Sequence, residues 1–496
     1  MRPTFLGFET ARKGLMVSQK ALDITGQNIT NISTPGYTRQ RVDQVSMTIS
    51  GQNSRYAINN NALAGQGVKI NGISQIRDSF LDKRFREEYG DVGYYDQSTL
   101  ILDDIEAALD EITSKGMKNA LAGLFTSIQD LTKNPDQVTH ANIVLTASRN
   151  ITQVLNQFDT KLNAIREQQK FDMEIAVDEV NSILERLAGL NESISKDLFL
   201  GSASTNEYYK PNELLDQRNL LLDELARYAD MRAVENADGT VTVDINGHVV
   251  VEQNKFETIN MVRHSDQTVS ANWQSTGGNV SLTTGSLKAF TDMINGRGAA
   301  ASGIRETFEQ GIPYYIDKID NFAKKFVEVM NGSIPEVDSA GVPIGTFKLL
   351  FEANNGGAIT AGSISVSGAW AAKPGYFISD VYTDGELDNR HLLNLLGKFS
   401  EDMDYGDFTG TFEEYINFYN TNIGQQKTFY QHRAENTAAI ADELLNRRDA
   451  ISGVSLNEEG TNLMLYEKAY QAASRLMTTL DEALDVLINR TGLVGR

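Results

Sequence analysis

The sequence predicts a mainly α-helical protein with β insertions, in which a long trunk of helices carries paired N- and C-terminal helices and small β-rich outer domains. Three observations predict this class. Prolines leave residues 136–210 and 375–496 uninterrupted. Apolar residues in these stretches recur at steps of three and four, which is typical of a helix with one packing face. Strand-like alternation replaces this period in only two stretches, 231–284 and 335–400.

The changes of period divide the chain into seven segments, in keeping with a length of 496 residues that exceeds a single core. These are 1–90 (helix, turn and extended segment of a terminal-helix domain), 91–230 (helical trunk), 231–284 (small β domain), 285–334 (trunk continued), 335–400 (β- and loop-rich insert), 401–453 (returning trunk) and 454–496 (C-terminal helix pairing with the N-terminal helix).

The first element is a helix that must end before Pro35, because proline disfavours helical geometry in the preceding residue and lacks an N–H donor. Pro35 and Gly36 fit the central positions of a type II turn, which reverses the chain. Its packing stripe is predicted to be Phe8, Ala11, Leu15, Ser18, Leu22, Thr25 and Ile29.

The trunk contains three further helical patterns before residue 230. One stripe runs from Met117 to Leu131 and ends near Pro135. A second begins at Val144 and extends to Gly189, and a third opens after Pro211. Each prediction rests on the three- and four-residue spacing of apolar side chains.

Two hairpin signals follow at Asp238-Gly239 and Asn246-Gly247, the residue pairs that tight β-turns prefer. They predict a small β module from 231 to 284. Helix returns at Leu287 and continues through a regular stripe from Ile312 to Val329, after which the sequence becomes Gly-rich and strand-like until about residue 385.

The C-terminal helix carries the clearest periodic pattern. Ser455 and Glu458 form a capping box, which satisfies free amides at a helix start. The heptad stripe that follows consists of Leu463, Tyr466, Tyr470, Ala473, Met477, Leu480, Leu484 and Leu487. A core helix of one domain would give the same pattern. The narrow stripes at both ends instead favour a terminal pair that buries its remaining apolar faces on other subunits.

The sequence offers little catalytic, cofactor-binding or metal-binding chemistry. The five histidines stand far apart, and Ser193 with Lys196 match only one part of a three-part hydrolase signature. An acidic loop at Asp402, Asp404 and Asp407 is better explained as a solvated surface. A net charge of −21 argues against nucleic acid or anionic lipid as a partner. The absence of long apolar runs argues against a membrane span and a cleaved secretory signal.

Four segments, in the right order, resemble a known family. Leu15–Asp43, with Asn28, Asn31, Pro35, Gly36 and Tyr37 at the signature positions, resembles the N-terminal signature of the axial proteins of the bacterial flagellum, the rod, hook and hook-associated proteins. The other three segments resemble the hook-associated members found at the hook–filament junction; they are Gly67–Glu88, Asn212–Val243 and Ser452–Ile488.

The resemblance implies a structural adaptor rather than an enzyme. Such proteins leave the cell unfolded through the flagellar type III apparatus, without a cleaved signal. They form a ring between hook protein and a second hook–filament junction protein, with terminal helices in the inner tube and inserted domains outside. A cytosolic export chaperone holds their C-terminal helix, which here implies contacts at Leu463, Tyr470, Met477, Leu480 and Leu484.

From this we expect an extracellular flagellar protein with partners that are itself, hook protein, the second junction protein and the chaperone, and with no cofactor, nucleic acid or membrane. Another axial protein (hook, rod or second junction protein) is the main alternative; an outer-domain adhesin or hydrolase is a weaker one. The expected assembly interface is Leu15, Leu22, Asn28, Ile29, Asn31, Pro35, Gly36, Tyr37, Leu463, Tyr466, Tyr470, Ala473, Met477, Leu480, Leu484 and Leu487.

Overall fold

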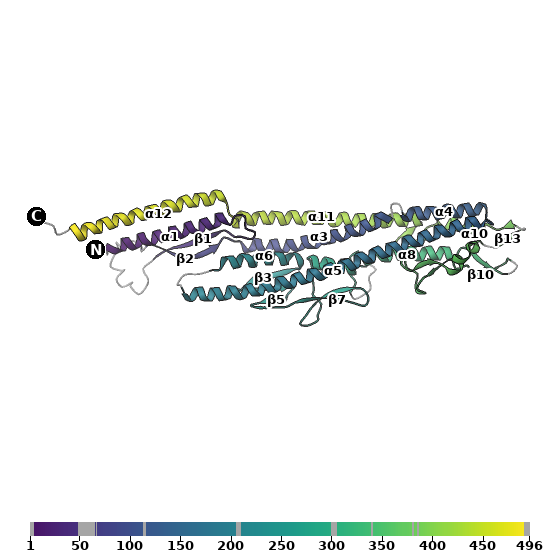
Figure 1. Ribbon diagram of the computed structural model, residues 1–496, viewed down its shortest axis with the longest axis horizontal. Helices are drawn as coiled ribbons and strands as arrows, with labels where there is room; N and C mark the ends of the chain where they lie inside the picture. The colour runs from purple at the N-terminus through teal and green to yellow at the C-terminus, as the bar shows by residue number, and fades with distance from the viewer. Residues whose placement is uncertain are drawn as a thin grey trace. The chain divides into compact units, whose positions relative to one another are not determined.

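The structure, a computed structural model, confirms a mainly α-helical fold with β insertions (Figure 1). It describes residues 4–47, 65, 67–112, 116–204, 210–298, 305–338, 341–378, 381–383 and 386–490. The α-helices are α1 Thr4–Thr30, α3 Ser79–Ile112, α4 Lys118–Lys133, α5 Val138–Ser204, α6 Asn212–Tyr228, α7 Ser286–Asn295, α8 Ile312–Asn331, α9 Gly368–Ala372, α10 Arg390–Lys398, α11 Phe412–Ser452 and α12 Leu456–Asp485. The described residues also include a 3-10 turn, Pro374–Phe377, and a π-helical end, Val486–Arg490.

The strands are short, and every pair among them is antiparallel. They are β1 Gln40–Ser46, β2 Val68–Gln75, β3 Met231–Glu235, β4 Val241–Ile245, β5 His248–Glu252, β6 Lys255–Phe256, β7 Ile259–Arg263, β8 Val269–Trp273, β9 Pro335–Val337, β10 Pro343–Phe347, β11 Phe351–Ala353, β12 Ile364–Val366, β13 Tyr382–Thr383, β14 Glu386–Leu387, β15 Met403–Asp404 and β16 Thr409–Gly410.

The chain folds into two compact units made of discontinuous segments. Unit 1 comprises 1–90, 180–258 and 437–496, and unit 2 comprises 91–179 and 259–436. The helices α3, α5 and α11 contribute residues to both units. The predicted segments divide the chain in sequence order, whereas each unit joins segments that are distant in sequence. The units therefore do not test the predicted division into domains.

Unit 1 contains the terminal helices. Figure 1 shows α12 (yellow) lying beside α1 (purple), with the β1–β2 hairpin on the opposite side of α1. Because α1 lies between two elements, it buries two sides; α12 lies at the edge of the unit and packs on one side only. The same unit holds α6 and the four-stranded sheet β3-β4-β5-β6.

Both predicted hairpin turns are confirmed in that sheet. β3 and β4 are joined through Asp238-Gly239, where Gly239 has φ +79° and donates its N–H to the Asn236 carbonyl at 3.0 Å. β4 and β5 are joined at Asn246-Gly247, whose φ angles of 47° and 84° are those of a type I′ turn. Beyond this sheet, β7 and β8 form a separate pair within unit 2, so the strands predicted for 231–284 fall into two sheets.

Unit 2 is built around α4, α8 and aromatic side chains. The predicted stripes are confirmed, because Leu121, Leu124 and Ile128 are buried on α4 and Phe322 and Phe326 are buried on α8. The Gly-rich insert packs its own aromatic residues against this core. Trp370 stacks on Phe377 at 5.1 Å between ring centroids, Phe351 contacts Trp370 at 5.6 Å, and Phe326 contacts Phe351 at 5.2 Å.

Two predicted helix boundaries are wrong. The helix predicted to stop at Gly189 continues to Ser204, since one glycine costs a helix only about 1 kcal/mol and the flanking turns are well packed. The returning trunk predicted from residue 401 begins with the β15–β16 hairpin instead, and α11 starts at Phe412. Gly406, with φ +99°, makes the turn between these strands.

Candidate functional site

The candidate site is the pairing of α1 with α12, which runs along a seam of small side chains. An added Cβ on Gly7 would lie 3.3 Å from Leu480 Cδ1, and one on Gly14 would lie 3.6 Å from Ala473 Cβ. One turn from the other end of α1, Asn28 Nδ2 lies 3.2 Å from the carboxylate of Glu459. From Gly7 to Gly14 the position on α1 rises by seven, while the contacted position on α12 falls by seven, from Leu480 to Ala473. The two helices form an antiparallel pair with a heptad repeat.

The α1 side of this seam differs from the predicted stripe. Ala11, Ser18 and Thr25 are buried as predicted, but the larger members of the stripe are only half-buried at its edge. Small and polar residues take their place; the seam consists of Gly7, Ala11, Gly14, Ser18, Ala21, Thr25 and Asn28. The prediction favoured the bulkiest apolar residues, whereas closely packed helices place small residues where their backbones approach.

The half-buried large residues of α1 are Phe8, Leu15, Leu22 and Ile29. On α12, Tyr466, Ala473, Met477, Leu480 and Leu484 are half-buried towards α1, while Leu463, Tyr470 and Leu487 are exposed. Glu459 is the one fully buried side chain among the described residues of α12.

The turn after α1 is confirmed. The Tyr37 N–H donates to the Thr34 carbonyl at 3.2 Å, and Gly36 has φ +76°, the geometry of a type II turn with Pro35 and Gly36 at its centre. This left-handed conformation is open to glycine at no steric cost. Gly36 also lies against Leu220 of α6, where an added Cβ would come within 3.5 Å.

The two asparagines next to the turn have distinct roles. Asn31 donates both its backbone N–H and its side-chain Nδ2 to the Gln27 carbonyl, each at 3.0 Å, and so holds the last turn of α1. Asn28 Oδ1 accepts from the Tyr37 hydroxyl at 2.9 Å and from the Gln40 N–H at 3.0 Å, and its Nδ2 donates to the Gln40 carbonyl at 2.9 Å. Asn28 therefore ties the end of α1 to the start of β1, and Tyr37 uses its hydroxyl within its own chain.

A buried ion pair completes this joint, and the sequence analysis missed both of its members. Arg39 Nε donates to Glu459 Oε1 at 2.8 Å, and Arg39 Nη1 donates to the more exposed Glu458 at 2.6 Å. The Arg39 N–H also donates to the Ser452 carbonyl at the end of α11, at 2.9 Å. The sequence shows the acidic pair Glu458-Glu459 at the start of α12 and the basic Arg39 after the turn. No local spacing rule connects residues that are so distant in sequence, so this pairing could not be predicted.

Glu458 shows that the predicted capping box is half formed. The Ser455 side chain accepts from the Glu458 N–H and caps α12, as predicted. The Glu458 carboxylate pairs with Arg39. It thus links the helix start to the residues that follow the turn.

A second buried polar cluster is formed by Arg77, just before α3, and by side chains of α3, α6 and the end of α11. Asp223 accepts from Arg86 at 2.7 Å and from Arg448 at 2.6 Å, and Arg77 pairs with Asp82 at 2.6 Å. All five side chains are paired, and none is more than 17% exposed. A buried polar network whose members are all bonded holds the helices that carry it in one arrangement.

Asp216 on α6 supports the segment after the turn. It accepts from the Thr38 N–H at 3.2 Å and from Gln75 Nε2 at 2.8 Å. Burial raises the pKa of its carboxyl to about 6, although the hydrogen bonds from Thr38 oppose this change. Burial also raises the pKa of the Tyr37 hydroxyl, and the neighbouring Asp216 carboxylate raises it further.

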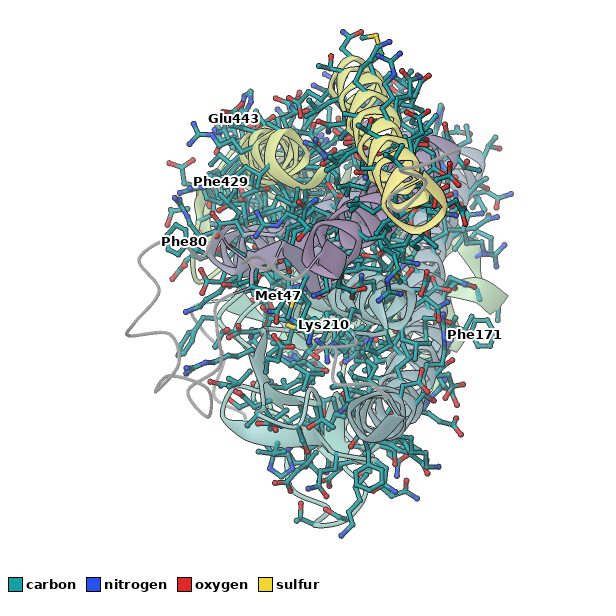
Figure 2. All side chains as sticks on the ribbon, turned by 90° about the vertical axis from the view of Figure 1, so that its left-hand side faces the viewer. Met47, Phe80, Phe171, Lys210, Phe429 and Glu443 are labelled. Atoms are coloured by element: carbon teal, nitrogen blue, oxygen red, sulfur yellow. The ribbon has the colours of Figure 1, made fainter. Side chains whose placement is uncertain are left out.

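One flank of α12, about 100° around the helix from the seam, carries a second heptad stripe, which no prediction included. It consists of Leu465, Ala469, Ala472, Leu476, Thr479, Ala483 and Val486, and all seven are exposed. Leu465, Leu476 and Val486 are 61%, 47% and 45% exposed. Figure 2 shows α12 (yellow) at the edge of the unit, with side chains projecting away from α1 (purple). We call these seven residues the open face of α12.

Within the described ranges, no group of three or more His, Asp or Glu side chains is arranged to hold a metal ion. Ser193 donates to the Gly189 carbonyl at 3.0 Å and Lys196 pairs with Glu192 at 2.6 Å, so each side chain is bound to its own helix. None of the described helices combines the length and apolar character needed to cross a bilayer.

Comparison with known families assigns both terminal helices and the trunk. The family model of the flagellar hook-associated protein FlgK helical domain matches residues 102–336. A flagella basal body rod protein model matches 8–38, which covers most of α1 and the turn. The C-terminal model of the flagellar basal body rod FlgEFG protein matches 449–490, which covers α12.

Full-length relatives agree with these matches. Flagellar hook-associated protein 1 of Bacillus subtilis (strain 168) is 29% identical over 538 aligned residues, covering 100% of each chain. The protein of the same name from Escherichia coli (strain K12) is 23% identical, covering 97% of this chain and 98% of its own. The flagellar hook junction protein FlgK from Burkholderia pseudomallei aligns in structure with a TM-score of 0.44 and 17% identity, over 54% of this chain and 46% of that chain.

The terminal signatures, the helical-domain match and the end-to-end relatives all point to one family. Along its whole length this chain is similar to flagellar hook-associated protein 1, and its terminal helices match family models of the axial proteins of the bacterial flagellum.

Proposed function

We propose that this chain is a structural subunit that joins the flagellar hook to the filament, and that copies of it assemble into a ring through their terminal helices. The relatives that span the whole chain are named hook-associated proteins, and the terminal helices match families of the basal body rod. In this proposal the terminal pair serves axial assembly, whereas the rest of the chain adapts one neighbour to the next.

The observation that carries the proposal is the open face of α12. A folded subunit gains stability by covering apolar side chains, yet this helix leaves Leu465, Leu476 and Val486 about half exposed in a single row. Contiguous exposed apolar surface marks a site of protein association. Heptad spacing adds that the missing partner is another helix. A second copy of the terminal pair supplies such a helix.

The residues expected at the assembly interface divide into three groups in this proposal. Leu463, Tyr470 and Leu487 are exposed and available to a neighbour. The half-buried residues hold the pair together and reach a neighbour only at their edges; they are Leu15, Leu22, Ile29, Tyr466, Ala473, Met477, Leu480 and Leu484. The turn residues shape the joint and contact their own chain; they are Asn28, Asn31, Pro35, Gly36 and Tyr37.

The other proposed partners follow from the proposed place of the ring in the flagellar axis, between the hook and the filament. Hook protein lies on one side of the ring and the second junction protein on the other. The chain travels to the cell exterior through the flagellar type III apparatus. A cytosolic chaperone holds Leu463, Tyr470, Met477, Leu480 and Leu484 before export. Since Met477, Leu480 and Leu484 lie towards α1 in the folded subunit, the chaperone and α1 compete for one face of α12.

A charge placed on the open face tests assembly without breaking the pair. We expect Leu465→Asp with Leu476→Asp to abolish junction formation, so that cells keep hooks and release flagellin into the medium. The subunit itself stays folded, because these side chains are exposed. A matched control is Leu349→Asp with Leu393→Asp, two leucines of unit 2 that are 49% and 51% exposed.

The readout is filament length by electron microscopy and flagellin in the culture supernatant, compared with a strain that lacks the protein. Filaments of normal length on the Leu465/Leu476 variant would contradict assembly through the open face. Normal flagellin retention in the deletion strain would contradict the junction function itself.

A further inference from the structure

The apolar part of the α1–α12 seam repeats itself and so specifies its register weakly. Gly7, Gly14 and Ala21 occupy equivalent heptad positions on α1, and none has a side chain larger than a methyl group. If α12 moved by one heptad, Ala473 would meet Ala21 and Leu480 would meet Gly14. Both contacts would fit as well as the present ones, since small residues accept either partner.

The polar end of the seam does not repeat. Asn28 takes the fourth heptad position, and opposite it Glu459 is only 2% exposed. Its two carboxylate oxygens are both bonded, Oε1 to Arg39 Nε at 2.8 Å and Oε2 to Asn28 Nδ2 at 3.2 Å. A shift that brings Ala473 to Gly7 would place the carboxylate opposite Ala21, without Asn28 and Arg39. A shift that brings Ala473 to Ala21 would carry the carboxylate past the end of α1 and break the same two contacts. Removing one partner of a buried ion pair is strongly destabilising, because it leaves a charge without compensation.

We infer that Glu459, bonded to Asn28 and Arg39, sets the register of α12 on α1. A single polar residue at one heptad position fixes register in helix pairs in the same way. The register in turn decides how far α12, and with it the open face, extends past α1. This inference rests on the contacts within one chain and does not depend on the proposed junction function.

The covalent link from α11 to α12 is the competing explanation. It consists of residues 453–455. A shift of one heptad moves α12 by about 10 Å. The link can supply that distance if about five helical residues uncoil, because each gains about 2 Å on extension. The link therefore restrains the register, and an experiment must separate its effect from that of Glu459.

The chain has no cysteine, so introduced pairs report the register directly. Gly14→Cys with Ala473→Cys reports the present register, since the two Cβ positions are 3.6 Å apart, close to the spacing of about 3.8 Å in disulfides. Ala21→Cys with Ala473→Cys and Gly7→Cys with Ala473→Cys report shifts of one heptad in the two directions. Each pair is placed in the full-length chain, oxidised at high dilution, and its intramolecular disulfide is quantified by mass spectrometry.

Three variants are compared with the parent chain. Glu459→Leu removes the carboxylate but keeps an apolar side chain, and Glu459→Gln keeps a hydrogen-bonding group without the charge. Glu458→Leu is the matched control, because Glu458 bonds the same Arg39 but its side chain is 62% exposed. Circular dichroism checks that each variant is folded.

We expect the Gly14/Ala473 disulfide alone in the parent chain and in Glu458→Leu. In Glu459→Leu, we expect at least a tenfold rise in one of the shifted disulfides with a matching fall in the Gly14/Ala473 product, and a smaller change of the same kind in Glu459→Gln. An unchanged pattern in Glu459→Leu would overturn the inference, because the link would then fix the register. Loss of all three disulfides would also overturn it, because Glu459 would then be needed for α12 to pair with α1 at all and would not select one register over another.

Discussion

The aromatic core of unit 2 and the terminal pair of unit 1 achieve burial in different ways. In unit 2, Phe326, Phe351 and Trp370 are fully buried and contact one another through their rings. In the terminal pair, small residues and a buried ion pair hold α12 on one side, and its apolar open face remains in solvent. The first region is complete within one chain. The second leaves apolar side chains of α12 exposed, and the proposed assembly would cover them.

The largest effect is expected from the aromatic core. Phe326→Ala should lower the free energy of unfolding by about 3–5 kcal/mol, because it removes a fully buried ring and leaves a cavity. Chemical denaturation followed by circular dichroism measures the change. Phe308→Ala is the control in the same unit; Phe308 is 78% exposed, so its loss should cost less than about 0.5 kcal/mol. Equal losses in both variants would mean that the ring contacts do not define the core.

A smaller effect is expected from overfilling the seam. Gly14→Leu should destabilise the α1–α12 pairing by about 1–3 kcal/mol, since a large side chain would press on Ala473. Limited proteolysis of α12 provides the readout. Gly26→Leu on the same helix is the control, because nothing lies within 4 Å of an added Cβ there. Equal proteolysis rates in both variants would show that the pairing does not depend on close packing at Gly14.

A pH-dependent effect of intermediate to small size is expected at the joint. Burial raises the pKa of Asp216 from 3.8 to about 6, so the folded state binds this proton more tightly than the unfolded chain does. The resulting stabilisation is fully present below pH 3.8 and is lost as the pH rises through 6. We expect this contribution to be on the order of 1–2 kcal/mol.

Denaturation of the wild type and of Asp216→Asn between pH 4 and pH 7 isolates this contribution. The stability of the wild type relative to the variant should fall with rising pH in that interval. A constant difference would show that the Asp216 carboxyl titrates alike in the folded and unfolded states.

The smallest effect is expected at a site outside both regions of the comparison. Gly189 lies inside α5 with nothing within 4 Å of an added Cβ. Gly189→Ala should therefore stabilise the protein by about 0.5–1 kcal/mol, by restricting the unfolded chain and favouring the helix. A shift of the denaturation midpoint to higher denaturant measures it. Destabilisation would point to a packing contact at this position.

The sequence predicted the regular parts of the fold because their signals are local. The α4 and α8 stripes, the Asp238-Gly239 and Asn246-Gly247 turns and the Pro35-Gly36 turn each follow from neighbouring residues. The extent of α5 past Gly189 was missed, since tertiary packing outweighs the preference of one glycine. The grouping of distant segments into two units depends on contacts that no local pattern encodes.

The candidate site was predicted at its turn and missed at its seam. Asn28, Gly36 and Tyr37 were found because they belong to one short signature. The seam residues Gly7 and Gly14 were missed because an apolar stripe is usually recognised by its large members. Arg39 and Glu459 are 420 positions apart, so their ion pair becomes visible only when the ends of the chain are brought together.

Hydrogen exchange of α12 in the isolated subunit and in assembled junctions tests the central claim most directly. That claim is that α12 lies on α1 in one chain and that its open face is covered only by a second copy. In dilute monomer, we predict that the amides of Leu456–Asp485 exchange much faster than those of α8, and that assembly slows their exchange strongly. Full protection in the monomer, or exchange that assembly leaves unchanged, would contradict the account.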